Sequence, residues 1–202
     1  EPTDLAQAEE GIRRLKFDEA FGIQLAMVRR RRENAALLAT PRPCRVGGLL
    51  DAFDARLPFE LTRGQVSIGE TIFDELAGSS PMHRLLQGDV GSGKTVVAAL
   101  SAVACIEAGW QCALMAPTEI LAEQHFLKFS QWFEPLGIKV DWFSGSLRKK
   151  AKDTAKAALA AGETRVAVGT HALFQDDVQF ARLGLVIVDE QHRFGVAQRL
   201  EI

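Results

Sequence analysis

Eight consecutive residues near the middle of the chain, GDVGSGKT, restrict its fold more than any other segment. They lie between a short apolar run at residues 84–87, which we expect to be a strand, and a helix-forming run that begins at Lys94. Glycines let the backbone curl so that successive N–H groups face one anion, and the N-terminus of the next helix adds positive charge. This order of strand, glycine-rich turn and helix predicts a phosphate-holding loop in an α/β domain.

The polar positions of this loop suit particular chemical roles. Lys94 supplies a compact positive charge that reaches the outer phosphates, and the hydroxyl of Thr95 can ligate Mg²⁺. The alternative interpretation is a glycine turn beside an ordinary helix-initial lysine. We assign the whole loop to nucleotide binding: Gly88, Asp89, Val90, Gly91, Ser92, Gly93, Lys94 and Thr95.

Two acidic residues, Asp189 and Glu190, follow the apolar run at residues 185–188. Ligands in open α/β sheets bind at the carboxyl ends of strands. There Asp189 can hold Mg²⁺ opposite Thr95, and Glu190 can orient and deprotonate the water that attacks the γ-phosphate. An isolated acidic pair after a strand is as often a helix N-cap, but the phosphate loop upstream favours a site. Together the motifs predict an NTPase with Lys94, Asp189 and Glu190 as its catalytic residues.

Short apolar runs alternate with longer helical runs through this part of the chain. We expect strands at residues 84–87, 112–116, 139–143, 166–168 and 185–188. We expect helices after a cap at Thr62, over residues 94–108 and 119–133, and from a cap at Ser146 to Gly162. Strands separated by helices are typical of βαβ units. The fold class is therefore α/β, with the parallel sheet of a P-loop NTPase.

The N-terminal part has a different pattern. Residues 4–38 follow a helical period, and two prolines at positions 41 and 43 prevent the helix from continuing. A short helix is expected at residues 49–56, before the α/β pattern begins. We therefore divide the chain into a helical region, residues 1–57, and an α/β domain, residues 58–202.

Composition excludes several classes of protein. The chain has 202 residues, 47% of them hydrophobic, three cysteines and a formal net charge of −2. It contains no CxxC pair and no apolar run near the roughly 20 residues that span a bilayer, so we expect a cytoplasmic protein without a membrane partner. The charge argues against a broadly basic nucleic-acid binder, and the composition permits a monomer. Because the chain starts at Glu1 and stops at Ile202 just after a motif, we expect a fragment.

Further segments occur in a recognisable order around the two motifs. FELTRGQ at residues 59–65 looks like the Q motif of superfamily 2 helicases, APTEIL at 116–121 like motif Ia, and GTHAL at 169–173 like motif Ib. DEQH at 189–192 is a DExH-type motif II and continues as RFGVAQR. Residues 87–95, 115–125 and 188–199 resemble RecG-type ATP-dependent DNA helicases, and the resemblance covers residues 57–202.

The resemblance implies roles for further residues. Gln65 would hydrogen-bond the adenine edge of ATP, or else be an exposed helix residue, and Phe59 would contact the base or anchor the packing. Thr118 and Thr170 would touch the DNA backbone, which positions a strand without reading its sequence, or would simply cap helices. His192 would couple motif II to a partner domain, although a lone histidine there is more often structural. The implied cofactors are ATP and Mg²⁺.

The resemblance also implies a function for the chain. It would be the first RecA-like motor domain of a helicase that acts on branched DNA, such as stalled forks and Holliday junctions, in recombination and repair. A second RecA-like domain with arginine fingers and a wedge domain, both on the same polypeptide, would be its partners, and residues 1–57 would be the connector from the wedge. The isolated chain should hydrolyse ATP poorly. The alternatives are a transcription-repair coupling translocase and a nucleotide-binding module without motor activity.

Overall fold

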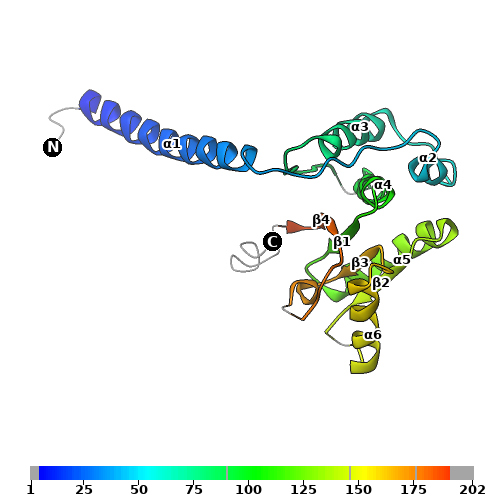
Figure 1. Cartoon of the computed structure of the whole chain (residues 1–202). Helices are drawn as coiled ribbons and strands as arrows, with labels where there is room; N and C mark the ends of the chain where they lie inside the picture. The colour runs from blue at the N-terminus through cyan, green and yellow to red at the C-terminus, as the bar shows by residue number, and fades with distance from the viewer. Residues whose placement is uncertain (1–4, 90, 146, 176, 192–202) are drawn as a thin grey trace. The chain divides into compact units, whose positions relative to one another are not determined.

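The computed structural model describes residues 5–89, 91–145, 147–175 and 177–191, and its internal contacts divide the chain into two compact units. One unit comprises residues 1–40 and 78–83, and the other comprises residues 41–77 and 84–202. Figure 1 gives the element labels used below.

The first unit contains a single long helix, α1 (Leu5–Ala35), which confirms the helix expected at residues 4–38. Along it the rings of Phe17 and Phe21 stack with centroids 6.0 Å apart. Arg14 pairs with Asp18 at 3.1 Å, one turn further along. The neighbouring segment 78–83 joins this unit through the Ser79 carbonyl, which accepts the N–H of Ala39 at 2.8 Å.

The second unit is built on a parallel sheet, as predicted. Its strands are β1 (Gln111–Met115), β2 (Val140–Phe143), β3 (Val166–Gly169) and β4 (Leu183–Val188), in the order β2-β3-β1-β4. All three pairings are parallel. Every residue of β1 and β3 is buried, which fits the mostly apolar sequence of these strands after the polar Gln111.

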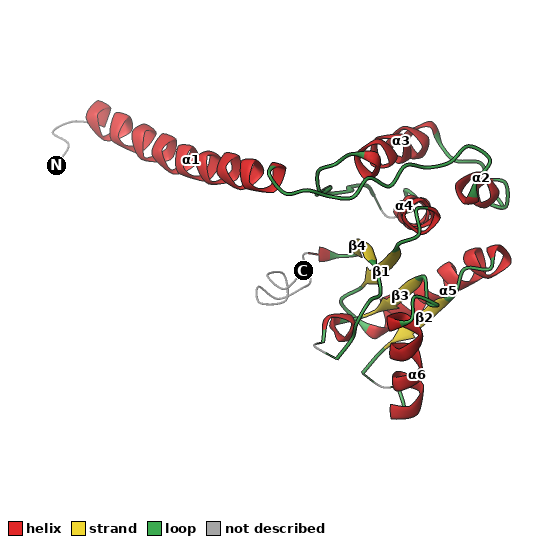
Figure 2. Cartoon of the chain, in the orientation of Figure 1, coloured by secondary structure: helices red, strands yellow, loops and turns green. Residues whose placement is uncertain are grey.

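Helices connect the strands and cover both faces of the sheet (Figure 2). The α-helices of this unit are α2 (Leu49–Asp54), α3 (Arg63–Ala77), α4 (Lys94–Glu107), α5 (Glu119–Phe133) and α6 (Lys149–Ala160), with short 3₁₀ helices η1 (Glu134–Leu136) and η2 (His171–Phe174). The crossovers through α5 and α6 run in opposite directions across the sheet. Because such crossovers are right-handed, these two helices lie on opposite faces.

Each face of the sheet has its own apolar packing. Phe143 and Leu159 form a buried cluster with Ala167 and Leu173 on the α6 side. Phe129 and Phe133 of α5 are fully buried, and Phe53 of α2 meets Phe133 edge-on at 5.6 Å between centroids. The sheet is therefore a rigid support for the loops at its edges.

Residues 41–57 lie in the same unit as the sheet and contact helix α4. The carboxylate of Glu107, the last residue of α4, accepts the N–H of Leu49 at 2.5 Å and that of Arg45 at 3.1 Å. It thereby accepts backbone N–H groups at the N-terminus of α2, where the N-cap residue, Gly48, has no side chain that could do so.

Two expectations about local structure are wrong. Residues 84–87 belong to no strand, and Leu85 is 70% exposed. A strand requires a hydrogen-bonded neighbour, and β4, an edge of the sheet, pairs only with β1 in the described ranges. Helix α6 begins at Lys149 with Arg148 at its N-cap, so Ser146, which lies outside the described residues, is not the cap.

None of the helices in the described ranges combines the length and the apolar character that a bilayer crossing requires.

Candidate functional site

The carboxyl edge of the sheet gathers the motifs found in the sequence. Met115, the last residue of β1, is in register with Gly169 of β3 and with Val188 of β4. The segments that follow these three strands therefore leave the sheet at one level. They carry Thr118, Thr170 and the pair Asp189–Glu190. This is the edge at which α/β sheets bind their ligands.

The glycine-rich loop adopts the backbone that its sequence predicts. Gly91 has a φ of +83° and Gly93 a φ of +81°, a region that only glycine enters readily. The loop ends at Gly93, which is the N-cap of α4. The ammonium of Lys94 donates to the carbonyls of Gly88 at 2.5 Å and Asp89 at 3.0 Å, so its charge is held within the loop. Val90 lies outside the described residues.

The loop is a close-fitting cradle in which side chains would interfere. A Cβ on Gly93 would come 2.1 Å from Nε2 of Gln65, and a Cβ on Gly88 would come 2.6 Å from Oγ of Ser92. Glycine is thus favoured at Gly93 by its φ, and a larger residue there would in addition force the side-chain amide of Gln65 to move. Bare backbone at a helix N-terminus, with a lysine beside it, is chemically suited to phosphate groups.

Gln65 connects the start of helix α3 to this loop. Its Oε1 accepts the N–H of Thr62 at 2.8 Å, while Oγ1 of Thr62 accepts the N–H of Gln65 at 3.3 Å, which is a capping box. Its Nε2 donates to the carbonyl of Ser92 at 3.0 Å. The cap predicted at Thr62 is confirmed, and Gln65 touches the phosphate loop directly. One amide hydrogen and one oxygen lone pair of Gln65 are still available to a ligand.

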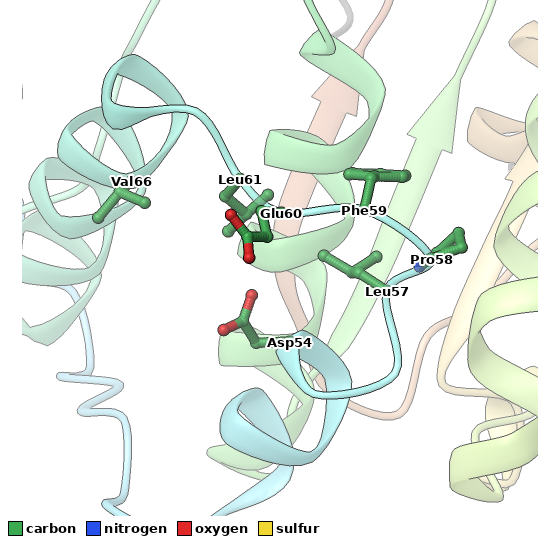
Figure 3. A pocket seen from close by; sticks show the side chains of 7 residues that line it. All are labelled: Asp54, Leu57, Pro58, Phe59, Glu60, Leu61 and Val66. Atoms are coloured by element: carbon green, nitrogen blue, oxygen red, sulfur yellow. The ribbon is translucent and has the colours of Figure 1, made fainter.

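Phe59 lines a pocket of about 490 Å³ between the end of α2 and the start of α3. Figure 3 shows the lining side chains, which are Asp54, Leu57, Pro58, Phe59, Glu60, Leu61 and Val66. Phe59 is 45% exposed, so it is not a core anchor. Of its two interpretations, an aromatic surface at a pocket suits the stacking of a base better than it suits packing.

Asp189 and Glu190 follow β4 and are held by specific contacts. Oδ2 of Asp189 lies 2.7 Å from Nε2 of His125, and Oδ1 accepts the N–H of Glu190 at 3.0 Å. Glu190 has a φ of +50°, which is strained for a residue with a Cβ and is typical of functional sites. The hydrogen bond to His125 lowers the pKa of Asp189, partial burial opposes it, and the charge of Lys94 lowers it further.

The threonines proposed to contact DNA lie in different surroundings. Thr118 is exposed and is the N-cap of α5, where its Oγ1 accepts the N–H of Leu121 at 3.3 Å. Thr170 is only 5% exposed, so a strand that passes there would meet neighbouring backbone rather than this hydroxyl. His192 lies outside the described residues.

The residues present suit Mg²⁺ bound together with a nucleotide. In the part of the chain that the structure describes, no cluster of three or more His, Cys, Asp or Glu residues could hold a metal by itself. Mg²⁺ usually binds through one or two carboxylates and substrate phosphates. An ionised Asp189 near Lys94 and the phosphate cradle is a donor set of that kind.

Sequence reasoning missed one residue of this site. His125 lies on α5 and reaches Asp189 from 64 positions away in the chain. The sequence did not predict this contact, because a single histidine in a helix does not indicate which residue it will bind. It does fall in the segment 115–125 on which the resemblance to helicases rests.

Known helicases are similar to this chain. Residues 67–202 match the family described as DEAD/DEAH box helicase. The chain is 51% identical to the ATP-dependent DNA helicase RecG of Pasteurella multocida, covering 93% of this chain and 27% of the relative. It is 45% identical to the RecG of Mycobacterium leprae, covering 96% of this chain and 28% of the relative. The chain thus spans about a quarter of the length of these relatives.

A solved structure gives the same relationship. RecG bound to a three-way DNA junction is 42% identical, with a TM-score of 0.85 over 96% of this chain and 26% of the other. The T4 bacteriophage helicase UvsW, at 20% identity and a TM-score of 0.55, shares the fold.

Proposed function

Because the chain belongs to the DEAD/DEAH box helicase family, we propose that it is the first RecA-like motor domain of an ATP-dependent DNA helicase that acts on branched DNA. The observation that carries the proposal is the meeting of two motifs at one sheet edge. Helix α4, which begins at Lys94 of the phosphate loop, contacts β4, and Asp189 follows directly after β4. The phosphate loop and Asp189 are far apart in the sequence, so the fold and not the local chain brings the two motifs together.

Each residue of the site then has a defined task. The loop amides and Lys94 hold phosphate oxygens, Thr95 and Asp189 hold Mg²⁺, and Glu190 orients and deprotonates the attacking water. When bound, Mg²⁺ neutralises phosphate charge. Gln65 and Phe59 bind the adenine base. The hydrogen bond from Gln65 to Ser92 connects the residues that bind the base to the loop that binds the phosphates.

Lys94→Ala in this chain is expected to weaken Mg-ATP binding by about 100-fold or more, since charge-assisted hydrogen bonds contribute about 1.5–3 kcal/mol each. Titration of a fluorescent ATP analogue measures the effect. Lys139→Ala, at an exposed lysine before β2, is a matched control that should bind like the wild type. Equal affinity of the Lys94→Ala and wild-type chains would show that the loop does not hold the phosphates.

The remaining parts of the motor belong to the intact protein in this proposal. Its relatives are longer, with about three quarters of their length outside the region matched here. We assign a second RecA-like domain with arginine fingers and a wedge domain to that remainder, and keep the division after residue 57 and a monomeric state as predictions. Thr118 at the N-terminus of α5 contacts the backbone of the DNA strand.

The DNA preference is tested with the intact protein. It should bind and unwind a three-way or four-way junction in preference to a linear duplex of the same length and composition, in an ATP-dependent way. Equal action on both substrates, together with stable binding to RNA polymerase, would favour a transcription-repair coupling translocase instead. Salt must be held constant, because phosphate contacts make all such affinities salt-dependent.

A further inference from the structure

His125 is a polar residue on the buried side of helix α5. Its side chain is 14% exposed. Ala122 and Phe129, which lie three residues before it and four residues after it, are both fully buried. Residues with this spacing share one face of a helix. Burying a polar group on such a face is unfavourable unless it forms a hydrogen bond, and the partner that His125 has is the carboxylate of Asp189.

We propose that His125 is a positioning residue that fixes the Asp189 carboxylate for Mg²⁺. The inference deepens the proposed function and rests on it. Two contacts define the orientation of this carboxylate, the imidazole Nε2 at one oxygen and the Glu190 amide at the other. Because each of the two oxygens has its own donor, rotation of the side chain would break at least one contact.

Helix α5 is a firm support for the imidazole. The helix spans fifteen residues, begins at the Thr118 cap and buries Ala122, Phe129 and Phe133. It contacts β2 and β3. Asp189, in contrast, follows the last residue of an edge strand. The bond from His125 therefore ties the end of β4 to the packed body of the domain.

The contact leaves the carboxylate able to bind a cation. A carboxylate offers about four lone-pair positions, and the two hydrogen bonds use one on each oxygen. A carboxylate oxygen accepts hydrogen bonds, so the tautomer of His125 that carries a hydrogen on Nε2 is the one that matches this contact. The remaining lone pairs are available to Mg²⁺ or its water. Loss of such an outer hydrogen bond typically costs 10–100-fold in metal affinity.

Three variants separate positioning from simple packing. His125→Gln places an amide N–H the same number of bonds from Cα as Nε2 and should keep the contact. His125→Leu keeps apolar volume but has no donor, and His125→Asn keeps an amide but is one methylene too short. Leu and Asn therefore lose the same hydrogen bond by different means, so an effect of packing alone would not make them agree.

The experiment is a Mg²⁺ titration of the binding of a fluorescent ATP analogue to the chain, with a parallel series in EDTA and a thermal melt of each variant. The wild type and His125→Gln should need similar Mg²⁺ concentrations, whereas His125→Leu and His125→Asn should need about 10–100-fold more. Binding in EDTA should be the same for all four. Should His125→Leu fail to fold, His125→Asn carries the comparison.

The outcomes distinguish the positioning role of His125 from the proposed function of the site. Unchanged Mg²⁺ requirements in both His125→Leu and His125→Asn would overturn the positioning role while leaving nucleotide binding intact. Impaired binding in EDTA as well as in Mg²⁺ would also overturn it, since that result indicates general damage to the site. Absence of saturable binding by the wild-type chain would instead overturn the proposed function on which this inference rests.

Discussion

Glu190→Gln is expected to lower ATP turnover by the intact protein about 10²–10⁴-fold, the usual contribution of a general base, while leaving nucleotide binding unchanged. Glutamine has the shape of glutamate but cannot take a proton from water. The backbone N–H of Glu190, which bonds to Oδ1 of Asp189, is unaffected by the substitution. The change therefore removes the chemistry of the side chain without removing the contact that holds Asp189.

The measurement is steady-state ATP hydrolysis with saturating junction DNA, alongside the affinity for a fluorescent ATP analogue. Glu163→Gln, at an exposed glutamate after α6, makes the same chemical change away from the site and should be indistinguishable from the wild type. Normal hydrolysis by Glu190→Gln would remove Glu190 from the role of base. A parallel loss of nucleotide affinity would show that Glu190 supports the site structurally.

Much of the fold could be predicted from local sequence. Helix α5 has the bounds that its sequence predicts, Glu119–Phe133, because a threonine cap precedes it and apolar residues recur at helical spacing. Helix α4 begins at Lys94 and ends before Gly109, whose φ of +87° suits a glycine. Such elements are determined by neighbours in the chain, which a sequence displays.

The strand predicted at residues 84–87 is absent because strand formation depends on residues that are distant in the chain. Its apolar residues predicted a strand. A strand forms only when its backbone hydrogen-bonds to another strand, and the local sequence does not specify which strand that is. The cap of α6 failed because the helix starts later than Ser146, at a position without a side-chain cap. Element boundaries of that kind depend on small energy differences between adjacent starting points.

The site was predictable in its motifs but not in its connections. Local patterns placed Lys94 at the start of a helix and Asp189 directly after a strand, and in the structure that helix, α4, contacts that strand, β4. They did not reveal the bond from Gln65 to Ser92 or the bond from His125 to Asp189. A polar side chain has many possible partners at long range, and only the assembled sheet and helices select one.

The net charge of −2 carries less weight than it did at first. If the domain holds one DNA strand through backbone amides and a few hydroxyls, as we propose for Thr118, it does not need a strongly basic surface overall. The charge does predict that the chain alone binds DNA weakly, and more weakly as salt increases.

We propose that this chain is part of a motor and not a self-sufficient nucleotide-binding module. In related enzymes an arginine finger from outside the phosphate site is worth about 10³–10⁵ in rate. We assign that arginine to the second RecA-like domain of the intact protein. The site described here would then bind ATP but hydrolyse it slowly, because the charge that develops on the transferred phosphate lacks its partner.

The most direct test is the rate of ATP hydrolysis by the chain alone and by the intact protein, each with and without junction DNA at one salt concentration. We expect the intact protein to be about 10³–10⁵-fold faster with junction DNA than the chain, and DNA to stimulate only the intact protein. Hydrolysis by the chain alone at the full DNA-stimulated rate would show that the chain needs no arginine from a second domain.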